Sequence, residues 1–497
     1  MKTTVLAGVF ALAASSFPTA QAFFRMPCSG PLLRERADPI VNPGTVSSHL
    51  HNIVGGNGFD FSMTYQKTQA ASCSTCKAKA DKSNYWIPDL YVKAKNGSYH
   101  NVGNGGATIY YLQRRDSPTE ELLPFPAGFR MLAGDPMRRS LDGAGIEQKG
   151  ISFACLGGNT KEGQTPTIPN YTCPYGLRLQ IVMPSCWDGK NLDSPDHKSH
   201  MAYPSGNDNG KCPSTHPKRF ITLFYEFLYD VKSWDNEWVN GKHPFVLSNG
   251  DPTGLSMHAD FVNGWDIPIL KKAIDQCNSG NGNIEECTVL ELNSDQATND
   301  CMVPNSIKEQ TEGWMSKLPG CNPIQPGPGK AITPPPCGAP TSIGTKQVFY
   351  TDMSSKGWEY VGCAFDDLNN RLLPYRYAKN DMTVPKCIDI CTSKGYTYAG
   401  LEYAEECFCG NSIATNKLGA MKCTMKCAGD ASQFCGGPVK LSVYKKSGSI
   451  VAKTSSAPSI TKTAITSKVK PSKTSKVPTT FKLYTTSKRA AAPTGKA

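Results

Sequence analysis

The stretch Phe220-Ile-Thr-Leu-Phe-Tyr-Glu-Phe-Leu-Tyr-Asp230 decides the fold class of the larger part of this chain. Apolar and polar residues alternate along it, although imperfectly, and this period of two is typical of a strand with one buried face. Gly176-Leu-Arg-Leu-Gln-Ile-Val-Met183 and Ala107-Thr-Ile-Tyr-Tyr-Leu112 also have strand patterns. Asp266–Gln276 is the best helix, because Asp266 can cap it and Pro268 suits its first turn. Many short strands and few helices predict a mainly β fold, a β-sandwich or jelly roll.

The net charge of the chain is unevenly distributed. The 497 residues include 53 Lys and Arg against 41 Asp and Glu, a formal charge of +12. Residues 447–497 hold ten of the basic residues and no acidic ones; without them and Lys2, residues 23–446 carry 42 basic and 41 acidic side chains. Because nucleic-acid binders concentrate positive charge on a folded surface, this distribution predicts no nucleic-acid partner.

The N-terminus, residues 1–22, has the pattern of a secretory signal peptide. It combines Lys2, the apolar run Val5–Ala14 and the small-x-small triplet Ala20-Gln21-Ala22. The apolar run is too short to span a bilayer, and the C-terminal RAAAPTGKA lacks the hydrophobic tail of a GPI signal. We therefore expect a secreted monomer, extracellular or associated with the cell wall, without a membrane anchor.

Two features of a secreted chain concern glycosylation. Asn96-Gly-Ser98 and Asn170-Tyr-Thr172 are acceptor motifs for N-glycans, so we expect Asn96 and Asn170 on the surface. Residues 447–497 contain 19 Ser and Thr with four Pro, which predicts a disordered, O-glycosylated stalk. Its basic residues should be attracted to an acidic matrix, an attraction that salt weakens.

The 20 cysteines divide around a proline-rich stretch, residues 322–341. Twelve lie at or before Cys337 and eight from Cys363 onward, so each block can pair internally as disulfides in an oxidising compartment. The stretch is a linker, or a loop tied down by Cys337. The predicted organisation is a signal peptide (1–22), a large β domain (23–321), a Pro-rich linker (322–356), a small disulfide-rich domain (357–446) and a disordered tail (447–497).

Residues 357–446 form the smaller of the two predicted domains. Four disulfides can stabilise so small a core, although spacing alone does not select among the 105 possible pairings. Pro385–Gly395 predicts a helix that places two of the cysteines on one face. The cysteines are Cys363, Cys387, Cys391, Cys407, Cys409, Cys423, Cys427 and Cys435.

The spacing of these cysteines resembles the WSC domain. The motifs that carry the resemblance are Tyr360-Val-Gly-Cys363, Cys387-x3-Cys391, Tyr398-Ala-Gly-Leu-Glu-Tyr403, Glu406-Cys-Phe-Cys-Gly410, Cys423-x3-Cys427 and Phe434-Cys-Gly-Gly437. The resemblance to the WSC domain implies a small disulfide-rich α+β module that binds carbohydrate. It therefore implies a β-glucan-like cell-wall or plant polysaccharide as partner. Flat aromatic faces and acidic side chains suit sugar binding, although each ring can instead fill the small core. The candidate carbohydrate-binding residues are Asp366, Asp367, Tyr375, Tyr396, Tyr398, Tyr403 and Phe408.

All eight histidines precede residue 259, and several occur in short polar motifs. In Ser48-His-Leu-His51 both imidazoles share a face if the segment is a strand. The candidate catalytic residues are His49, His51, His200, His216, Glu226, His258 and Asp260. Imidazoles and carboxylates can coordinate a divalent metal, act as general acid and base on a glycan, or form only local hydrogen bonds. No cofactor is firmly predicted, and a metal at the histidines stays an open alternative.

Residues 24–290 resemble a fungal secreted family of unknown function, DUF1996. The resemblance rests on Asp38-Pro-Ile-Val-Asn-Pro-Gly44, Ser47-Ser-His-Leu-His-Asn-Ile-Val-Gly-Gly56, Cys186-Trp-Asp-Gly-Lys-Asn-Leu-Asp193, His197-Lys-Ser-His200, Cys212-Pro-Ser-Thr-His-Pro217 and Gly250-Asp-Pro-Thr-Gly254. It implies no activity. Two hypotheses remain: a wall-associated glycan-binding protein without catalysis, and a hydrolase-like or metal-assisted enzyme on polysaccharide, tethered by the WSC domain. A metal-sequestering surface protein is a third. Histidines gathered within about 10 Å in one cleft would support a site.

Overall fold

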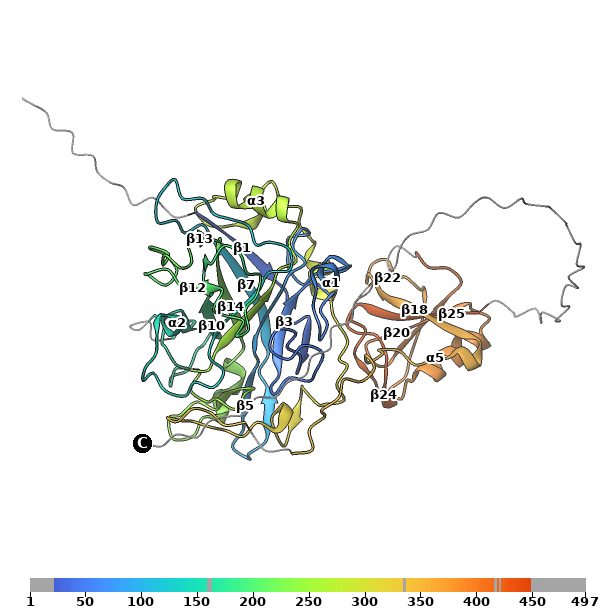
Figure 1. Cartoon of the computed structure of the whole chain (residues 1–497). Helices are drawn as coiled ribbons and strands as arrows, with labels where there is room; N and C mark the ends of the chain where they lie inside the picture. Colours follow the sequence, from blue (N-terminus) through green and yellow to red (C-terminus); the bar gives the residue numbers. More distant parts are fainter. Residues whose placement is uncertain (1–21, 159–162, 334–336, 415–417, 420–421, 448–497) are drawn as a thin grey trace, which may run out of the picture. The chain divides into compact units, whose positions relative to one another are not determined.

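The computed structural model describes residues 22–158, 163–333, 337–414, 418–419 and 422–447. The predicted signal peptide and Ser/Thr-rich tail lie outside these residues, apart from Ala22 and Ser447. Strands dominate the described residues, which confirms the mainly β prediction (Figure 1). No helix in these ranges combines the length and the apolar character that a bilayer crossing requires.

Two five-stranded antiparallel sheets form a sandwich in the N-terminal region. The first has the order β1 (Phe23–Cys28), β7 (Asn104–Leu112), β14 (Thr222–Tyr229), β10 (Leu177–Val182) and β9 (Ile151–Cys155). The second has the order β2 (Leu33–Glu35), β3 (His51–Gly55), β4 (Asn84–Pro88), β16 (His258–Val262) and β8 (Arg130–Gly134). The three strands predicted from sequence are β14, β10 and β7, in the first sheet.

The core lies between the two sheets and follows from the alternation along their strands. In β14 the odd-numbered residues Leu223 to Tyr229 are completely buried. They belong to the same hydrophobic cluster as Tyr85 and Phe261 of the second sheet, and the rings of Tyr85 and Tyr225 are 5.6 Å apart. The alternate residues, such as Glu226 in the first sheet and His258 in the second, therefore face away from this core.

Smaller elements surround the sandwich. One sheet has the order β12 (Met201–Ala202), β11 (Cys186–Trp187) and β13 (Lys218–Arg219); another has β15 (Phe245–Leu247), β5 (Leu90–Lys93), β6 (Tyr99–Asn101) and β17 (Trp314–Met315). The helices are α1 (Tyr65–Gln69), α2 (Ile146–Lys149), α3 (Ile267–Gln276) and α4 (Asp295–Asp300). Helix α3 confirms the predicted helix: Asp266 caps it by accepting from the Ile269 amide, and Pro268 lies in its first turn.

The C-terminal region has a small α+β fold with its own sheets. Its sheet has the order β19 (Tyr375–Ala378), β21 (Glu406–Gly410), β20 (Tyr398–Glu402), β25 (Lys440–Lys446), β18 (Trp358–Phe365) and β22 (Leu418–Gly419). β23 (Lys426–Cys427) and β24 (Asp430–Phe434) form a hairpin. Helix α5 (Val384–Ser393) carries Cys387 and Cys391 on its buried face, as predicted, and disulfides join them to Cys407 and Cys409.

All 20 cysteines form disulfides, and each block pairs internally, as predicted. The pairs are Cys28–Cys76, Cys73–Cys301, Cys155–Cys173, Cys186–Cys212, Cys277–Cys287, Cys321–Cys337, Cys363–Cys423, Cys387–Cys407, Cys391–Cys409 and Cys427–Cys435. The pair Cys321–Cys337 encloses the first part of the proline-rich stretch. Residues 322–333 form a strap over the N-terminal region, because the Gln325 amide donates to Gly250 O and the Ala331 amide to Met137 O, both at 2.9 Å.

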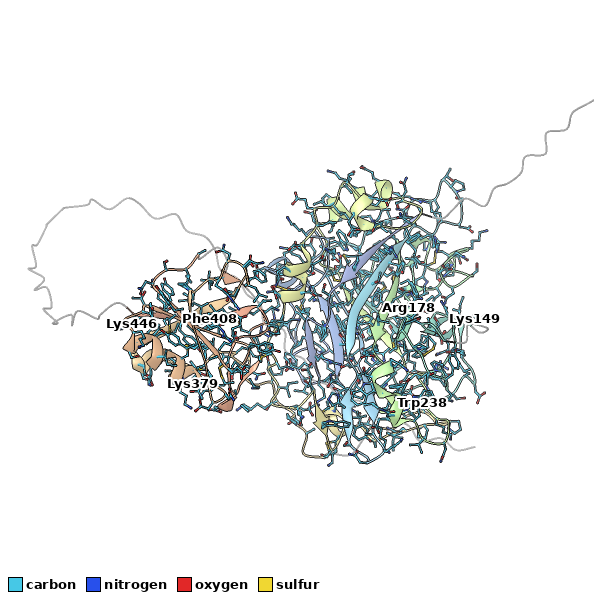
Figure 2. The ribbon with its side chains drawn as sticks, turned by 180° about the vertical axis from the view of Figure 1, so that it is seen from behind. Lys149, Arg178, Trp238, Lys379, Phe408 and Lys446 are labelled. Atoms are coloured by element: carbon cyan, nitrogen blue, oxygen red, sulfur yellow. A yellow bond between two sulfur atoms is a disulfide. The ribbon has the colours of Figure 1, made fainter. Side chains whose placement is uncertain are left out.

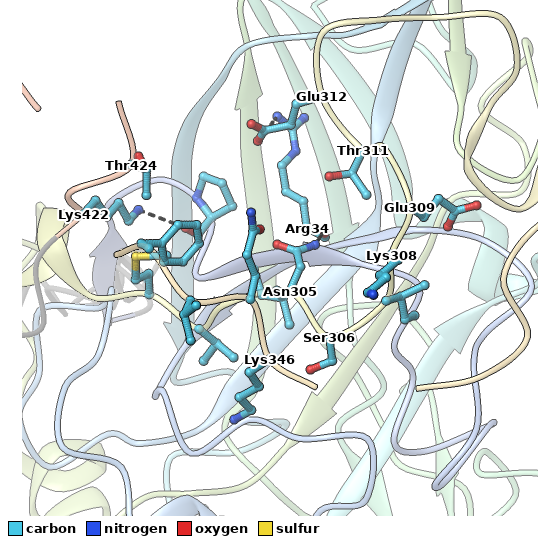
Figure 3. A pocket seen from close by; sticks show the side chains of 18 of the residues that line it. Arg34, Asn305, Ser306, Lys308, Glu309, Thr311, Glu312, Lys346, Lys422 and Thr424 are labelled. Carbon is cyan, nitrogen blue, oxygen red and sulfur yellow. Dashed lines mark hydrogen bonds and ion pairs between the residues drawn. The ribbon is translucent and has the colours of Figure 1, made fainter. Parts of the chain in front are cut away.

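A buried ion pair connects the two sheets of the sandwich. Arg34 of β2 donates from Nε to Asp89 Oδ2 at 2.7 Å, and the Asp89 side chain is fully buried. Tyr229, at the end of β14 in the first sheet, donates to the other Asp89 oxygen at 2.9 Å. Arg34 also lies 3.5 Å from Glu312, beside it in Figure 3. Because the guanidinium has little access to water, the Asp89 carboxylate is its main source of charge compensation.

We predict that Asp89→Asn destabilises the fold. The substitution keeps the shape of the side chain but leaves the Arg34 charge buried beside a neutral amide, which should cost about 3 kcal/mol of unfolding free energy. Chemical denaturation of the full chain measures this. The control is Asp275→Asn, which removes an exposed ion pair with Lys271 and should cost less than about 1 kcal/mol. Equal losses in the two variants would contradict the role of the Arg34–Asp89 pair.

Candidate metal centre

Three histidines meet on the outer face of the second sheet. Strands β3 and β16 flank β4, so their first residues, His51 and His258, lie on neighbouring parts of this face. His49 lies two residues before His51, and the two rings are 4.4 Å apart, close together as the His-x-His spacing predicts. All three side chains are buried. The sheet register therefore assembles the cluster from segments more than 200 residues apart in sequence.

The Nε2 atoms of the three imidazoles point toward one another. His258 Nε2 lies 3.0 Å from His49 Nε2 and 3.4 Å from His51 Nε2. The donor atoms of all three residues lie within 4.8 Å of one another. Two nitrogen ligands bound tetrahedrally to zinc at 2.0–2.1 Å are about 3.3 Å apart. The separations of His258 Nε2 from the other two Nε2 atoms are thus close to those of imidazoles that share one tetrahedral ion.

Backbone carbonyls fix which nitrogen of two histidines carries the proton. His51 Nδ1 lies 3.0 Å from Ala37 O, and His258 Nδ1 lies 2.8 Å from Ser256 O. A carbonyl oxygen only accepts, so each Nδ1 donates and each Nε2 keeps its lone pair. Two lone pairs 3.4 Å apart do not form a hydrogen bond, whereas both can coordinate a cation. A carbonyl behind the ring is also the usual outer contact of a metal-binding histidine.

The loop before β16 positions one of these carbonyls. Asp251 accepts hydrogen bonds from the amides of Thr253 and Ser256 and from both of their hydroxyls, at 2.6 to 2.8 Å. These bonds hold the backbone of Ser256, whose carbonyl faces His258. Opposite His258 on β8, Gly134 has a φ of +85°, and a Cβ there would come within 2.4 Å of Met257 O. Gly134 therefore permits the close strand approach on which the position of His258 depends.

Two buried carboxylates share a cavity with two of the histidines. The cavity has a volume of about 130 Å³, and its lining includes His49, His258, Asp38 and Asp260. Asp260 is 1 % exposed, and its Oδ2 has no hydrogen-bond partner among the described residues. Asp38 accepts from the amides of Ile40 and Val41 at 3.1 Å. An unpartnered buried carboxylate near the Nε2 lone pair of His258 is an environment that a divalent cation would stabilise.

Burial sets the protonation of the site. It lowers the pKa of His51 to about 4 and that of His258 to about 3, and it lowers the pKa of His49 well below its ordinary value. Burial also raises the pKa of Asp38 and, together with the charge of Asp38, that of Asp260. The imidazoles are therefore neutral near pH 7, which is the form that binds metals.

Two cationic side chains and the strap complete the surroundings. Lys198 donates from Nζ to Gly134 O. Buried Arg139 donates to Asn249 O at 3.1 Å and to Gln325 O of the strap at 2.8 Å. Gln325, Ala331 and Ile332 of the strap line the cavity. Val41 and Ile332, also in the lining, are 51 % and 71 % exposed, so the cavity reaches the surface between them.

Three of the predicted catalytic residues lie away from the cluster. His200 has Ser194 Oγ at 2.9 Å and Arg130 O at 2.8 Å, and His216 has Thr215 Oγ1 at 2.9 Å and Ser199 O at 3.0 Å. Both nitrogens of each ring thus have hydrogen-bond partners, and neither residue lines the cavity. Glu226 lies on the outer face of the first sheet. The expected grouping of all these residues is therefore corrected to His49, His51, His258 and Asp260.

Sequence reasoning missed Asp38, Lys198 and Arg139. Asp38 and Lys198 lie in motifs that carry the family resemblance, Asp38-Pro-Ile-Val-Asn-Pro-Gly44 and His197-Lys-Ser-His200. Both motifs therefore marked the right segments, although neither identified these two side chains as part of a site. Arg139 lies in Asp135-Pro-Met-Arg-Arg139, where we find no sequence signal for its role.

The predicted carbohydrate-binding residues divide into exposed and buried groups. Tyr375 and Tyr403 are 51 % and 55 % exposed, and Tyr396 stacks on Tyr375 at 4.8 Å. Two predictions need correction. Asp366 is fully buried, where it accepts from Arg371 at 2.7 Å, and Phe408 is 1 % exposed in the core of the region, so neither side chain is available to a sugar (Figure 2 labels Phe408).

The remaining predicted surface residues are accessible to different degrees. Asp367 is half-buried and accepts from the Asn369 amide at 2.9 Å, and Tyr398 is half-buried with Lys445 5.9 Å from its ring centre. Asn96 and Asn170, the predicted glycan acceptors, are both exposed. Asn96 lies in a turn and Asn170 in a bend.

Comparisons with known proteins divide the chain at the same place. Residues 38–265 match the family described as Domain of unknown function (DUF1996), and residues 360–437 match the WSC domain. A protein named Putative fungistatic metabolite, from Chaetomium globosum, is 31 % identical over 173 residues, which are 32 % of this chain and 76 % of that protein. These matches cover both the sandwich that carries the histidines and the disulfide-rich region.

Other relatives share only a short segment. A WSC domain-containing protein of Arthroderma benhamiae is 35 % identical over 113 residues, which are 22 % of this chain and 12 % of that protein. Xylosyltransferase oxt of Drosophila melanogaster is 37 % identical over 89 residues, 17 % of this chain and 10 % of that protein. The chain thus spans about a tenth of the length of these two relatives.

We predict that the full chain binds one Zn²⁺ ion through the three histidines. His51→Ala and His258→Ala each remove one imidazole and should weaken binding at least about 100-fold, since three protein ligands are the usual minimum for zinc. Metal content after dialysis and competition with a chelating dye measure this. His216→Ala is the matched control and should bind like the unaltered chain. Equal affinity in all three variants would contradict the site.

Proposed function

Because the chain belongs to the DUF1996 family and carries a WSC domain, we propose that it is a secreted protein of the fungal cell surface that binds polysaccharide and acts on it through a metal ion. The WSC domain binds the glycan. His49, His51 and His258 hold the ion. The observation that carries the proposal is the convergence of three Nε2 atoms, two of them with lone pairs directed by carbonyls behind their rings.

Several observations support the glycan as partner. Of the relatives reported, one is named for a WSC domain and another for xylosyl transfer, which is chemistry on sugars. In this chain the WSC domain exposes Tyr403 and Tyr375, and the half-buried Tyr396 stacks on Tyr375. Aromatic rings of this kind pack on the apolar faces of sugar rings.

The residues of the metal centre have distinct roles in the proposed function. Three neutral imidazoles leave a fourth position of a tetrahedral ion open, as in catalytic rather than structural zinc sites. A zinc ion bound there would supply Lewis-acid chemistry to an oxygen of the substrate. Asp260 has a free carboxylate oxygen in the same cavity, where it can accept a proton, and Asp38 and Lys198 adjust its charge environment. The carbonyls of Ala37 and Ser256 hold the rings in orientation.

The size of the cavity favours a second candidate function. A volume of about 130 Å³ is smaller than the roughly 300 Å³ of typical ligand pockets, and the strap covers part of it. An ion in so enclosed a site would stabilise the fold without contacting a polysaccharide chain. The protein would then be a non-catalytic wall-binding protein, with the metal in a structural role.

We predict that the zinc-loaded full chain releases soluble oligosaccharides from insoluble β-1,3-glucan. Chelation should abolish release and zinc should restore it, whereas His51→Ala should stay inactive with zinc, because one ligand is missing. Chromatography of the supernatant measures the products. If zinc binds and raises the melting temperature but no condition releases products from β-glucan, xylan or chitin, the enzyme hypothesis is wrong and the structural role holds.

We also predict that Tyr375→Ala weakens retention of the full chain on insoluble β-glucan. Loss of the exposed stacking ring should reduce affinity roughly 3- to 10-fold. Depletion binding assays measure this, and Tyr175→Ala, an exposed tyrosine of the N-terminal region, is the control that should leave retention unchanged. Undiminished retention of the Tyr375→Ala protein would place glycan binding elsewhere.

A further inference from the structure

The outer face of the first sheet carries an organised group of polar and aromatic side chains. Because the odd-numbered residues of β14 fill the core, Phe224 and Glu226 face outward. The strand register places Gln180 of β10 directly beside Glu226, and Tyr110 of β7 beside Phe224. This group is unconnected with the histidine cluster, which lies on the outer face of the other sheet.

Glu226 is held rigidly by its neighbours. It accepts from Tyr110 Oη and Arg178 Nη1, both at 2.9 Å, and from Gln180 Nε2 at 2.7 Å. Ser152 donates to Gln180 Oε1 at 3.1 Å, which orients the amide. A carboxylate offers about four acceptor positions, so three donors leave about one position for another hydroxyl or amide. The carboxylate is oriented in advance toward whatever enters beside it.

A groove lies over this carboxylate. It has a volume of about 360 Å³, which is in the range of small-molecule sites. Phe23, Tyr110 and Phe224, all half-buried, form its aromatic wall, with ring centres 6.0 Å and 5.4 Å apart in succession. Glu226 and Ser152 supply polar atoms between the strands. The groove therefore offers flat apolar surfaces beside fixed hydrogen-bonding groups.

The charges around the groove are mostly paired. Arg114 pairs with Asp208 at 3.1 Å across one side of the lining. Arg178 pairs with Glu226 at 2.9 Å, and Lys149 is exposed at the rim; Figure 2 labels both Arg178 and Lys149. Because each carboxylate of the lining has an arginine partner, the groove carries no strong charge of one sign, which suits a neutral ligand rich in hydroxyl groups.

We propose that this groove, bounded by Phe23, Tyr110, Phe224 and Glu226, is a second saccharide-binding site of the protein and takes a neutral sugar chain. The aromatic wall packs on the C–H face of a sugar ring. Glu226 accepts a hydrogen bond from a ring hydroxyl, and the Arg114–Asp208 pair contacts neighbouring hydroxyls. The site goes beyond the proposed function, because it needs neither the metal ion nor the WSC domain. It would hold the polysaccharide on the sandwich itself.

The test separates this site from the other two. The full chain carrying Tyr375→Ala and Tyr403→Ala, kept in chelator, is applied to an array of neutral glucan, mannan, xylan and chitin oligosaccharides. We expect it to bind at least one of them. Adding Phe224→Ala or Glu226→Gln should weaken that binding at least about tenfold, because each removes a contact made only in the groove.

Leu228→Ala is the matched control, since Leu228 lies on the same outward face of β14 but does not line the groove. It should bind like its parent chain, and thermal unfolding should show that all variants remain folded. Absence of binding to every neutral oligosaccharide would overturn the proposal. The proposal would also be overturned if the Phe224→Ala and Glu226→Gln proteins bound as well as the Leu228→Ala protein. It would be overturned too if Leu228→Ala weakened binding as much as Phe224→Ala and Glu226→Gln do.

Discussion

The alternation of side chains between the two faces of a strand is the constraint on which the rest of the sandwich depends. Leu223, Tyr225 and Phe227 fill the core, so Phe224 and Glu226 have to face outward. The second sheet obeys the same rule: Phe261 packs inward, and His258 and Asp260 face outward. A core between two sheets thus leaves two outer faces, each with a group of polar side chains of different chemistry.

The two surfaces are built by different means. At the histidine cluster, backbone atoms do most of the positioning: carbonyls orient His51 and His258, and Gly134 allows the strands to approach. At the groove, side chains hold Glu226 through direct hydrogen bonds. Burial favours neutral imidazoles at the first surface, whereas a carboxylate with three donors is held ready to accept at the second. The chemistry of the histidine cluster therefore suits a metal ion, and that of the groove suits a sugar.

Local patterns predicted much of the fold but only part of the candidate site. The alternation in 220–230 predicted β14, and the Asp266–Pro268 start predicted α3, because both signals act within a few residues. The spacing of His49 and His51 also placed them together. Their contact with His258 depends on the strand order β3-β4-β16. That order cannot be read from any local sequence pattern. His200 and His216 lie in equally suggestive motifs, yet the carbonyls of Arg130 and Ser199 contact their Nε2 atoms.

The strap adds a mechanical consequence. In sequence, residues 322–336 lie between the sandwich and the WSC domain, and part of this segment covers the histidine cavity. If the WSC domain binds a polysaccharide, as proposed, a pull on that polysaccharide passes tension along the chain. The covalent bond between Cys321 and Cys337 carries that force directly to the end of the sandwich and bypasses the enclosed loop. Tension on the chain after Cys337 therefore does not stretch the strap that lines the histidine cavity.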